Sequence, residues 1–453
     1  MEVSTSPISI QPILVNQDDF KENRSSISVE VRLSSQATSS LSILKQEIEI
    51  YLNSLPEQFI PSKIVEFKNS PLLTKSVESV WLSFNNSESS DIFIETKKVS
   101  LSDYDLKTCI YRLFSGDEAD PTQEMIKVND ESVCCGLRWS LPSVHFDEIW
   151  NNLIFEENLK QDLLNYLHGC LVFSEGKVNP NIISWNRMIL FHGPPGTGKT
   201  SLCKALANKT SIRMYEKYRS THFFEISTEN LMSKWFSESP RYVAQMFNLI
   251  EEYLQDEKNL IFLLIDEVES LATTRNKAIS NNDPSDAVRV VNAFLTHIDR
   301  IKRYNNVLIM ATSNILDLLD NALVDRADLK IHIGSPTIPA LYSILRSCIN
   351  ELQRVEIIET TNSYPLLTYN NLLSMKFQNE PISENSLLLI DVCKTAHGLN
   401  GRTLRKIPLI CYSLYYSKYA DKSHDKLKCY IMALRDAVES KLNENNLLFK
   451  DNL

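Results

Sequence analysis

The sequence lacks several features that would place it in a membrane or outside the cell. Its longest apolar run, residues 260–265, is too short to cross a bilayer. Residues 1–4 carry neither the basic stretch nor the apolar stretch of a secretory signal. No two of the nine cysteines have the C-x-x-C spacing of a zinc or redox motif. We therefore expect an intracellular, soluble protein with reduced thiols and no membrane partner.

The sequence also has no continuous run of basic residues, although local basic patches stay open. Asp and Glu together number 57 against 47 Lys and Arg, which gives a formal net charge of -10. Affinity for duplex DNA depends largely on cations that neutralise its phosphates. The charge balance therefore disfavours nucleic acid as the partner, and no direct sequence-specific binding of nucleic acid is expected.

Hydrophobic patterns suggest how the 453 residues are organised. In residues 1–114, alternating apolar residues between Ile27 and Leu33 predict a strand, and helical spacing between Leu44 and Leu55 predicts a helix. We therefore expect a mixed α/β N-terminal domain. The polar residues that follow it are typical of a connection, and we place a linker at 115–140.

Residues 141–338 alternate short buried strands with amphipathic helices. The predicted strands are 188–191, 223–226, 260–265, 307–311 and 330–333. Such alternation is typical of a parallel sheet covered by helices. Strand signals thin out after Pro339, so residues 339–453 are predicted to form a helical lid. The expected fold class is α/β, with a phosphate-loop core, a helical C-terminal lid and the mixed N-terminal domain.

One motif in this core matches a phosphate-binding loop, G-x-x-x-x-G-K-T, completely. Its residues are Gly193, Pro194, Pro195, Gly196, Thr197, Gly198, Lys199 and Thr200. Backbone N–H groups of such a loop surround phosphate oxygens, and the positive end of the following helix, which includes Ser201, points at them. Lys199 is predicted to contact the β- and γ-phosphates, and the Thr200 hydroxyl to bind Mg²⁺. The alternative is a glycine-rich turn that matches by chance. The strand before the motif and the helix after it favour ATP and Mg²⁺ as cofactors.

A pair of acids ends the strand predicted at 260–265. Asp266 and Glu267 come at its carboxyl end, where α/β sheets bind ligands. Asp266 is predicted to hold the magnesium shell, and Glu267 to orient and activate the attacking water. The alternative is a pair that only caps the strand. The complete phosphate loop upstream favours the catalytic interpretation.

The order of the later motifs resembles that of the AAA+ ATPase family. The resemblance implies that Asn314 positions the attacking water and that Arg326 reaches the γ-phosphate of a neighbouring subunit, where it stabilises transition-state charge. The alternatives are a turn asparagine and a surface ion pair of Arg326 with Asp325 or Asp328. Most members of the family carry two arginines in this region, whereas here a single arginine lies between aspartates.

Within that family, the chain from about residue 141 onward resembles a branch of remodellers that act on HORMA-domain proteins. No motif before that point contributes. The segments that carry the resemblance are 183–187, 200–207, 233–239, 266–271, 284–293, 324–328 and 399–408.

This resemblance implies that the protein binds a polypeptide in a central pore. Lys234, Trp235 and Phe236 are expected to form a pore loop, since exposed aromatic side chains can wedge against an extended chain. The alternative is that the two aromatic residues belong to the core, which their polar neighbours disfavour. Residues 276–283 are a second, less decisive pore loop. Arg402 resembles a lid arginine that touches the γ-phosphate within its own subunit, the alternative being an ordinary surface arginine.

The resemblance also implies function and partners. We expect a homo-hexameric ring that uses ATP to convert HORMA-domain proteins from a closed to an open form, in meiotic chromosome-axis control and spindle checkpoint signalling. The N-terminal domain would receive the substrate, in some cases through a HORMA-like adaptor. The expected location is the nucleus, on chromosomes, with the cytoplasm as a second compartment. Two other functions compete: a nucleotide-gated scaffold that does not thread its partner, and a DNA-acting AAA+ ATPase.

Overall fold

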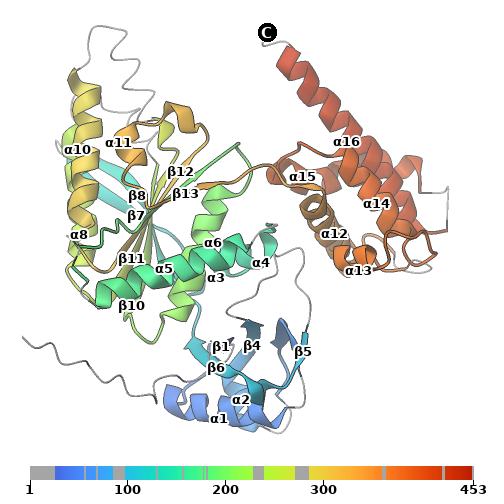
Figure 1. Ribbon diagram of the computed structural model, residues 1–453, viewed down its shortest axis with the longest axis horizontal. Helices are drawn as coiled ribbons and strands as arrows, with labels where there is room; N and C mark the ends of the chain where they lie inside the picture. The colour runs from blue at the N-terminus through green and yellow to red at the C-terminus, as the bar shows by residue number, and fades with distance from the viewer. Residues whose placement is uncertain are drawn as a thin grey trace, which may run out of the picture.

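The computed structural model describes residues 26–450 except 56–57, 68–69, 85–96, 129–130, 156–157, 177, 180–181, 228–238, 271–284, 360–363 and 421–423. Figure 1 shows three parts: a small N-terminal α/β unit, a larger α/β unit and a helical unit at the C-terminus. In the described part of the chain, no helix combines the length and apolar character needed to cross a bilayer.

The N-terminal unit is a four-stranded sheet with helices packed on it. The strand order is β3 (Ser62–Ile64), β4 (Val77–Phe84), β1 (Ser26–Leu33) and β6 (Asp105–Tyr111). Helices α1 (Leu41–Ser54) and α2 (Pro71–Ser76) belong to it, with a two-stranded ribbon of β2 (Gln58–Ile60) and β5 (Lys97–Val99). The predicted strand and helix are confirmed, since Val29 and Val31 of β1 are buried against Leu44 and Ile48 of α1.

The large unit is built on a seven-stranded sheet. Its order is β13 (Leu329–His332), β9 (Met188–His192), β12 (Val307–Ser313), β11 (Asn259–Asp266), β10 (Ser220–Ser227), β8 (Glu131–Leu141) and β7 (Thr122–Val128). The first five strands run parallel, and they include all five strands predicted from the sequence. Their carboxyl ends therefore meet along one edge of the sheet.

Helices cover both faces of this sheet (Figure 1). Helices α8 (Ser239–Leu254) and α10 (Ser285–Ile301) pack on one face, and α5 (Leu159–Glu175) and α6 (Lys199–Arg213) on the other. Short helices α3 (Val144–Asp147), α4 (Ile149–Asn152) and α11 (Asn321–Val324) complete the unit. Successive residues of β11 point alternately to the two cores, which explains why this strand is continuously apolar.

The linker predicted at 115–140 is wrong. Only the start of this stretch is a connection, with a short 3-10 turn at Gly116–Glu118. Strands β7 and β8 follow and extend the large sheet as antiparallel strands, β8 pairing with β10. The polar composition has a physical cause: β7 is an edge strand, and its Thr122, Gln123 and Met125 side chains are exposed.

The C-terminal unit is helical, as predicted. It consists of α12 (Ile338–Arg354), α13 (Tyr369–Ser374), α14 (Glu384–Thr395), α15 (Gly401–Ile410) and α16 (Lys426–Lys450). These helices and their connections share one apolar core, which includes Tyr342, Leu389 and Tyr430. In Figure 1 the far end of α16 projects away from the rest of the molecule.

The N-terminal unit docks on the C-terminal end of α6 through a buried carboxylate. Glu30 of β1 is only 2% exposed. Its carboxylate contacts Lys209 of α6, and Arg213 Nε lies 3.7 Å from it. Tyr111 and Leu113 pack against Ile212 at the same junction. An exposed pair, Lys45 with Glu216 at 3.4 Å, lies at its edge.

This junction yields a stability prediction. Replacing Lys209 with methionine leaves the Glu30 carboxylate buried with Arg213 as its remaining cation, and removing one partner of a buried pair is costly. We expect a loss of at least about 2 kcal/mol, seen as a lower melting temperature. Lys45→Met removes the exposed pair instead and should change stability by less than about 1 kcal/mol. Equal melting temperatures for the two variants would show that the buried pair does not hold the junction.

Candidate nucleotide-binding site

The phosphate-binding motif forms the loop between β9 and α6. Its first glycine, Gly193, has φ +139°, and a Cβ there would lie 2.2 Å from the carbonyl oxygen of Ile333. Gly196 has φ +78°, and a Cβ there would come within 3.1 Å of three atoms of the Asn400 side chain. Glycine is therefore required at both positions, by backbone conformation and by close neighbours. The loop leads directly into α6, whose N-terminus is the positive end of the helix dipole.

Lys199 is directed back over this loop. Its Nζ donates to the carbonyl oxygens of Gly193 at 2.7 Å and Pro194 at 2.9 Å, and to Oδ1 of Asn314 at 2.8 Å. Burial lowers the pKa of Lys199, while the carboxylates of Glu269 and Asp266 act in the opposite direction. These hydrogen-bond acceptors are neutral oxygens, so a phosphate would give the ammonium group an anionic partner within the same loop.

Asn314 links Lys199 to an acid that the sequence did not single out. Its Nδ2 donates to Oε1 of Glu269 at 2.8 Å, and its backbone N–H donates to the same oxygen at 3.1 Å. Glu269 therefore fixes the orientation of the Asn314 amide. The structure thus brings Asn314 to the phosphate loop, while its predicted contact with the attacking water stays a prediction. Glu269 lies in the D-E-V-E segment next to the acid pair, which is the signal that could have identified it.

The two hydroxyl groups around Asp266 orient its carboxylate. Thr200 Oγ1 donates to Oδ1 of Asp266 at 3.0 Å, and the buried Thr312 hydroxyl donates to the same oxygen. A hydroxyl and a carboxylate at the end of a strand are the hard oxygen ligands that Mg²⁺ prefers. Thr200 and Asp266 are therefore the residues that could hold Mg²⁺. Thr312, seen in the sequence only as the end of a strand, is a further residue of the site.

Glu267 has a strained backbone and an exposed side chain. Its φ is +58°, a conformation that costs non-glycine residues roughly 1–3 kcal/mol and occurs mainly at functional sites. Its N–H donates to Oγ1 of Thr312 at 3.2 Å, so Thr312 holds both acids of the pair. The carboxylate is exposed at the carboxyl edge of the sheet, where a general base for an attacking water has to be.

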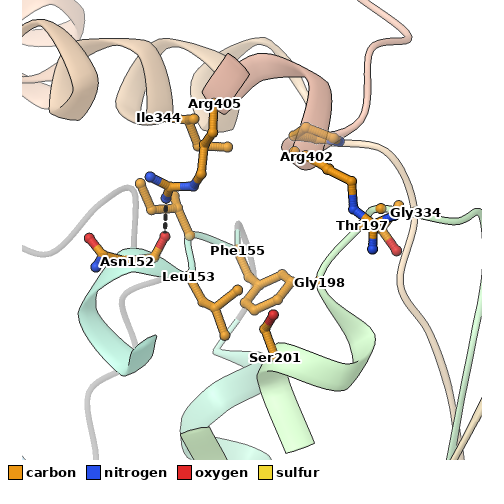
Figure 2. A pocket seen from close by; sticks show the side chains of 14 residues that line it. Asn152, Leu153, Phe155, Thr197, Gly198, Ser201, Gly334, Ile344, Arg402 and Arg405 are labelled. Atoms are coloured by element: carbon orange, nitrogen blue, oxygen red, sulfur yellow. Dashed lines mark hydrogen bonds between the residues drawn. The ribbon is translucent and has the colours of Figure 1, made fainter. Parts of the chain in front are cut away.

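A cavity of about 280 Å³ opens beside the loop. Its floor is the loop and the start of α6, including Thr197, Gly198 and Ser201, and apolar side chains of Leu153, Phe155 and Ile344 line it elsewhere. Figure 2 shows the Phe155 ring beside Ser201 and Gly198, and Arg405 of the lid bonded to Asn152. These apolar side chains could receive the flat base of a nucleotide, and the loop beside them could receive its phosphates. The sequence analysis missed the segment 152–155, whose apolar run before α5 was its only signal.

The lid touches the phosphate loop at the start of α15. Asn400 caps this helix by accepting from the N–H of Thr403 at 2.8 Å, and its Nδ2 donates to the carbonyl of Pro195 at 3.2 Å. The backbone N–H of Arg402 donates to the carbonyl of Gly196 at 3.1 Å. The Arg402 side chain points toward Thr197 and Gly334 (Figure 2). Arg402 thus lines the cavity beside the loop, and its contact with the γ-phosphate stays a prediction.

Arg326 has a different setting from the other predicted residues. Its guanidinium forms two hydrogen bonds with Asp299 of α10, at 2.8 and 2.7 Å. The surface ion pair considered for Arg326 is therefore present, but its partner is Asp299 and not Asp325 or Asp328. Asp328 instead accepts hydrogen bonds from Tyr166 at 2.7 Å and from Asn186 at 2.7 to 3.0 Å.

The predicted pore-loop residues, Lys234, Trp235 and Phe236, lie outside the described residues, as does the segment 276–283.

Family models match three parts of the chain. They are described as the TRIP13 N-terminal domain over residues 22–115, the ATPase family associated with various cellular activities over 189–335, and the TRIP13-like AAA+ ATPase lid C-terminal domain over 337–442.

Known proteins match nearly the whole length. A pachytene checkpoint protein 2 homolog from Sus scrofa is 41% identical over 394 residues, which cover 86% of this chain and 88% of that protein. The Danio rerio homolog is 39% identical over 93% of this chain and 95% of its own length. The solved structure of C. elegans PCH-2 matches with a TM-score of 0.72 and 34% identity, covering 92% of this chain and all of that one.

Proposed function

Because this chain belongs to the pachytene checkpoint protein 2 family of AAA+ ATPases, and therefore binds and hydrolyses ATP, we propose that it is a hexameric remodeller that partly unfolds HORMA-domain proteins. The proposal that the substrates are HORMA-domain proteins rests on the motif resemblance in segments such as 233–239 and 399–408. The settings proposed on the same ground are the meiotic chromosome axis and the spindle checkpoint, with the protein in the nucleus on chromosomes and also in the cytoplasm. A HORMA-like adaptor is a further proposed partner.

One observation supports a machine more than a static binding module: lid and phosphate loop are directly bonded. Asn400 and Arg402 at the start of α15 contact the carbonyls of Pro195 and Gly196. Nucleotide that enters the cavity beside this contact lies against both units, so ATP and ADP can favour different lid positions. A lid that changes position with the nucleotide is a means of moving pore loops.

The site supplies the hydrolytic half of the proposed mechanism. Lys199 and the loop amides would bind the phosphates, while Thr200 and Asp266 would hold Mg²⁺, which neutralises phosphate charge when bound. In this proposal Glu267 accepts a proton from the attacking water, and Asn314, whose amide is oriented by Glu269, aligns that water. A scaffold that only binds nucleotide has no need for Glu267 at this edge.

The pore-loop claim has a direct test. Trp235→Ala removes the proposed aromatic wedge and none of the residues proposed for the nucleotide site, so we expect ATPase turnover to fall by less than about threefold while HORMA remodelling is lost. The measurements are phosphate release and the open-to-closed ratio of a purified HORMA protein by ion-exchange chromatography. The control is Tyr364→Ala, another aromatic residue, 53% exposed on the lid. Unaltered remodelling by Trp235→Ala would remove the pore-loop assignment.

A second experiment separates the competing functions. Turnover and gel-filtration size are measured with ATP alone, with a HORMA protein, and with single-stranded or duplex DNA. A remodeller is expected to elute as a hexamer with ATP and to be stimulated by the HORMA protein. Binding without stimulation favours the scaffold, and stimulation by DNA favours the DNA-acting ATPase.

A further inference from the structure

Arg326 is held at its side chain by an acid on a neighbouring helix. Asp299 accepts from Nε at 2.8 Å and from NH2 at 2.7 Å, which occupies one whole edge of the planar guanidinium. NH1 donates to the carbonyl of Ala322 at 2.6 Å. The hydrogen bonds from Arg326 lower the pKa of Asp299, so this carboxylate is ionised near neutral pH.

The same end of α10 also holds the main chain of Arg326. Lys302, which follows the helix directly, donates from Nζ to the carbonyl of Arg326 at 3.2 Å. The carbonyl of Lys302 in turn accepts from the buried guanidinium of Arg187, which also bonds Ser174 at 3.1 Å. The backbone of Arg326 is thus anchored to the body of the large unit, and its side chain is the part free to change partner.

The pair with Asp299 is at the surface. The Arg326 side chain is 27% exposed and that of Asp299 is 49% exposed. Exposed ion pairs add little to the stability of a folded chain. A bidentate pair at this location therefore has little effect on folding. Its main effect is on the position of the guanidinium and on how easily that group dissociates from Asp299.

We propose that Asp299 is a positioning residue for Arg326: it holds the guanidinium in the separate subunit and releases it to the triphosphate of a neighbouring subunit. The inference rests on the proposed role of Arg326 as a residue acting in trans. Asp299 occupies the edge of the guanidinium formed by Nε and NH2, so a phosphate that binds this edge has to displace the carboxylate. The terminal phosphate of ATP competes for this edge more strongly than ADP does, because ADP lacks the group that Arg326 is proposed to reach.

Assembly of subunits is thereby made dependent on ATP. Each contact in which Arg326 reaches the terminal phosphate of ATP first has to break the Asp299 pair, which raises the subunit concentration needed for assembly with ATP. Asp299→Asn weakens the pair while keeping the size of the side chain. With the ATP analogue we expect half-maximal assembly at a subunit concentration roughly three- to tenfold lower, and with ADP little change, because ADP has no terminal phosphate to take the guanidinium from Asp299.

The test compares four full-length proteins: wild type, Asp299→Asn, Arg326→Ala and the double variant. Sedimentation velocity over a range of subunit concentrations, with Mg²⁺ and either a non-hydrolysable ATP analogue or ADP, gives the concentration for half-maximal assembly. The shift caused by Asp299→Asn should disappear in the Arg326→Ala background, because Asp299 acts through that arginine. Glu351→Gln is the matched control. It removes the carboxylate of a similar two-bond pair, with Arg354 on α12 at 2.7 Å, and should shift nothing.

The outcomes separate this inference from the function on which it rests. No shift with Asp299→Asn, or the same shift with and without Arg326, overturns the role of Asp299. If Arg326→Ala assembles and hydrolyses ATP as the wild type does, Arg326 does not act in trans, and both claims fall. If Arg326→Ala is impaired and Asp299→Asn is silent, only the role of Asp299 is lost.

Discussion

Protein carrying Glu267→Gln is expected to bind ATP and to hydrolyse it about 100- to 10,000-fold more slowly than the wild type. Glutamine keeps the size of the side chain but cannot accept a proton from water. The groups that bind the phosphates and the metal, Lys199, Thr200 and Asp266, are left in place, with Thr200 still bonded to Asp266. Steady-state phosphate release measures the loss, and retention of labelled ATP after gel filtration measures the binding.

The control for this variant is Glu257→Gln, at an exposed position just before the opposite end of β11. It makes the same chemical change at a distance from the loop and should leave turnover unaltered. Because the backbone of Glu267 is strained whatever its side chain, the glutamine variant should also melt at the wild-type temperature. Full hydrolysis by Glu267→Gln would show that another group activates the water.

Arg326→Ala is expected to lower turnover by about 1,000-fold or more, the effect typical of an arginine supplied in trans to a phosphoryl transfer. Binding of ATP to the separate subunit should stay within about twofold, because the guanidinium lies on Asp299 in that subunit and bonds no residue of the phosphate loop. Phosphate release and nucleotide titration by fluorescence measure the two quantities.

Mixing two inactive variants tests the direction of this contribution. Subunits with Glu267→Gln keep an intact Arg326, and subunits with Arg326→Ala keep an intact Glu267. Where they alternate in one assembly, half of the sites have both groups, so turnover should reappear on mixing. Mixtures that stay as inactive as their components would contradict a site divided between subunits.

Local patterns were sufficient for the centre of the fold and for the phosphate loop. The apolar strand 260–265 and the motif 193–200 carry their signal within a few consecutive residues, and both have the predicted structure. Strands β7 and β8 were missed because their residues are not continuously apolar; Thr122 and Gln123 of the edge strand β7, for example, are polar and exposed. The signal there is the same as that of a connection.

The rest of the site depends on contacts between distant segments. Thr312 holds Asp266 from 46 positions away, and Leu153 reaches the loop only because the chain before α5 packs there. Asp299 and Arg326 are 27 positions apart, and helical periodicity marks which residues of α10 are buried, but not which exposed carboxylate meets an arginine. Such pairings follow from how the elements pack, which a short pattern does not contain.

Helix α6 is joined to a different part of the molecule at each of its ends. Its first turn continues the phosphate loop at Lys199. Near its last turn, Lys209 and Arg213 form ion pairs with Glu30 of the N-terminal unit. Its 15 residues make a rod about 22 Å long, stiff on this scale. A displacement of the N-terminal unit can therefore be transmitted along α6 to the phosphate loop, although Arg32 of β1 also contacts the large unit, at Asp147 of α3 (2.9 Å). Thermodynamic coupling is reciprocal. If bound nucleotide changes the affinity of the N-terminal unit for a partner through α6, that partner changes the affinity for nucleotide by the same factor.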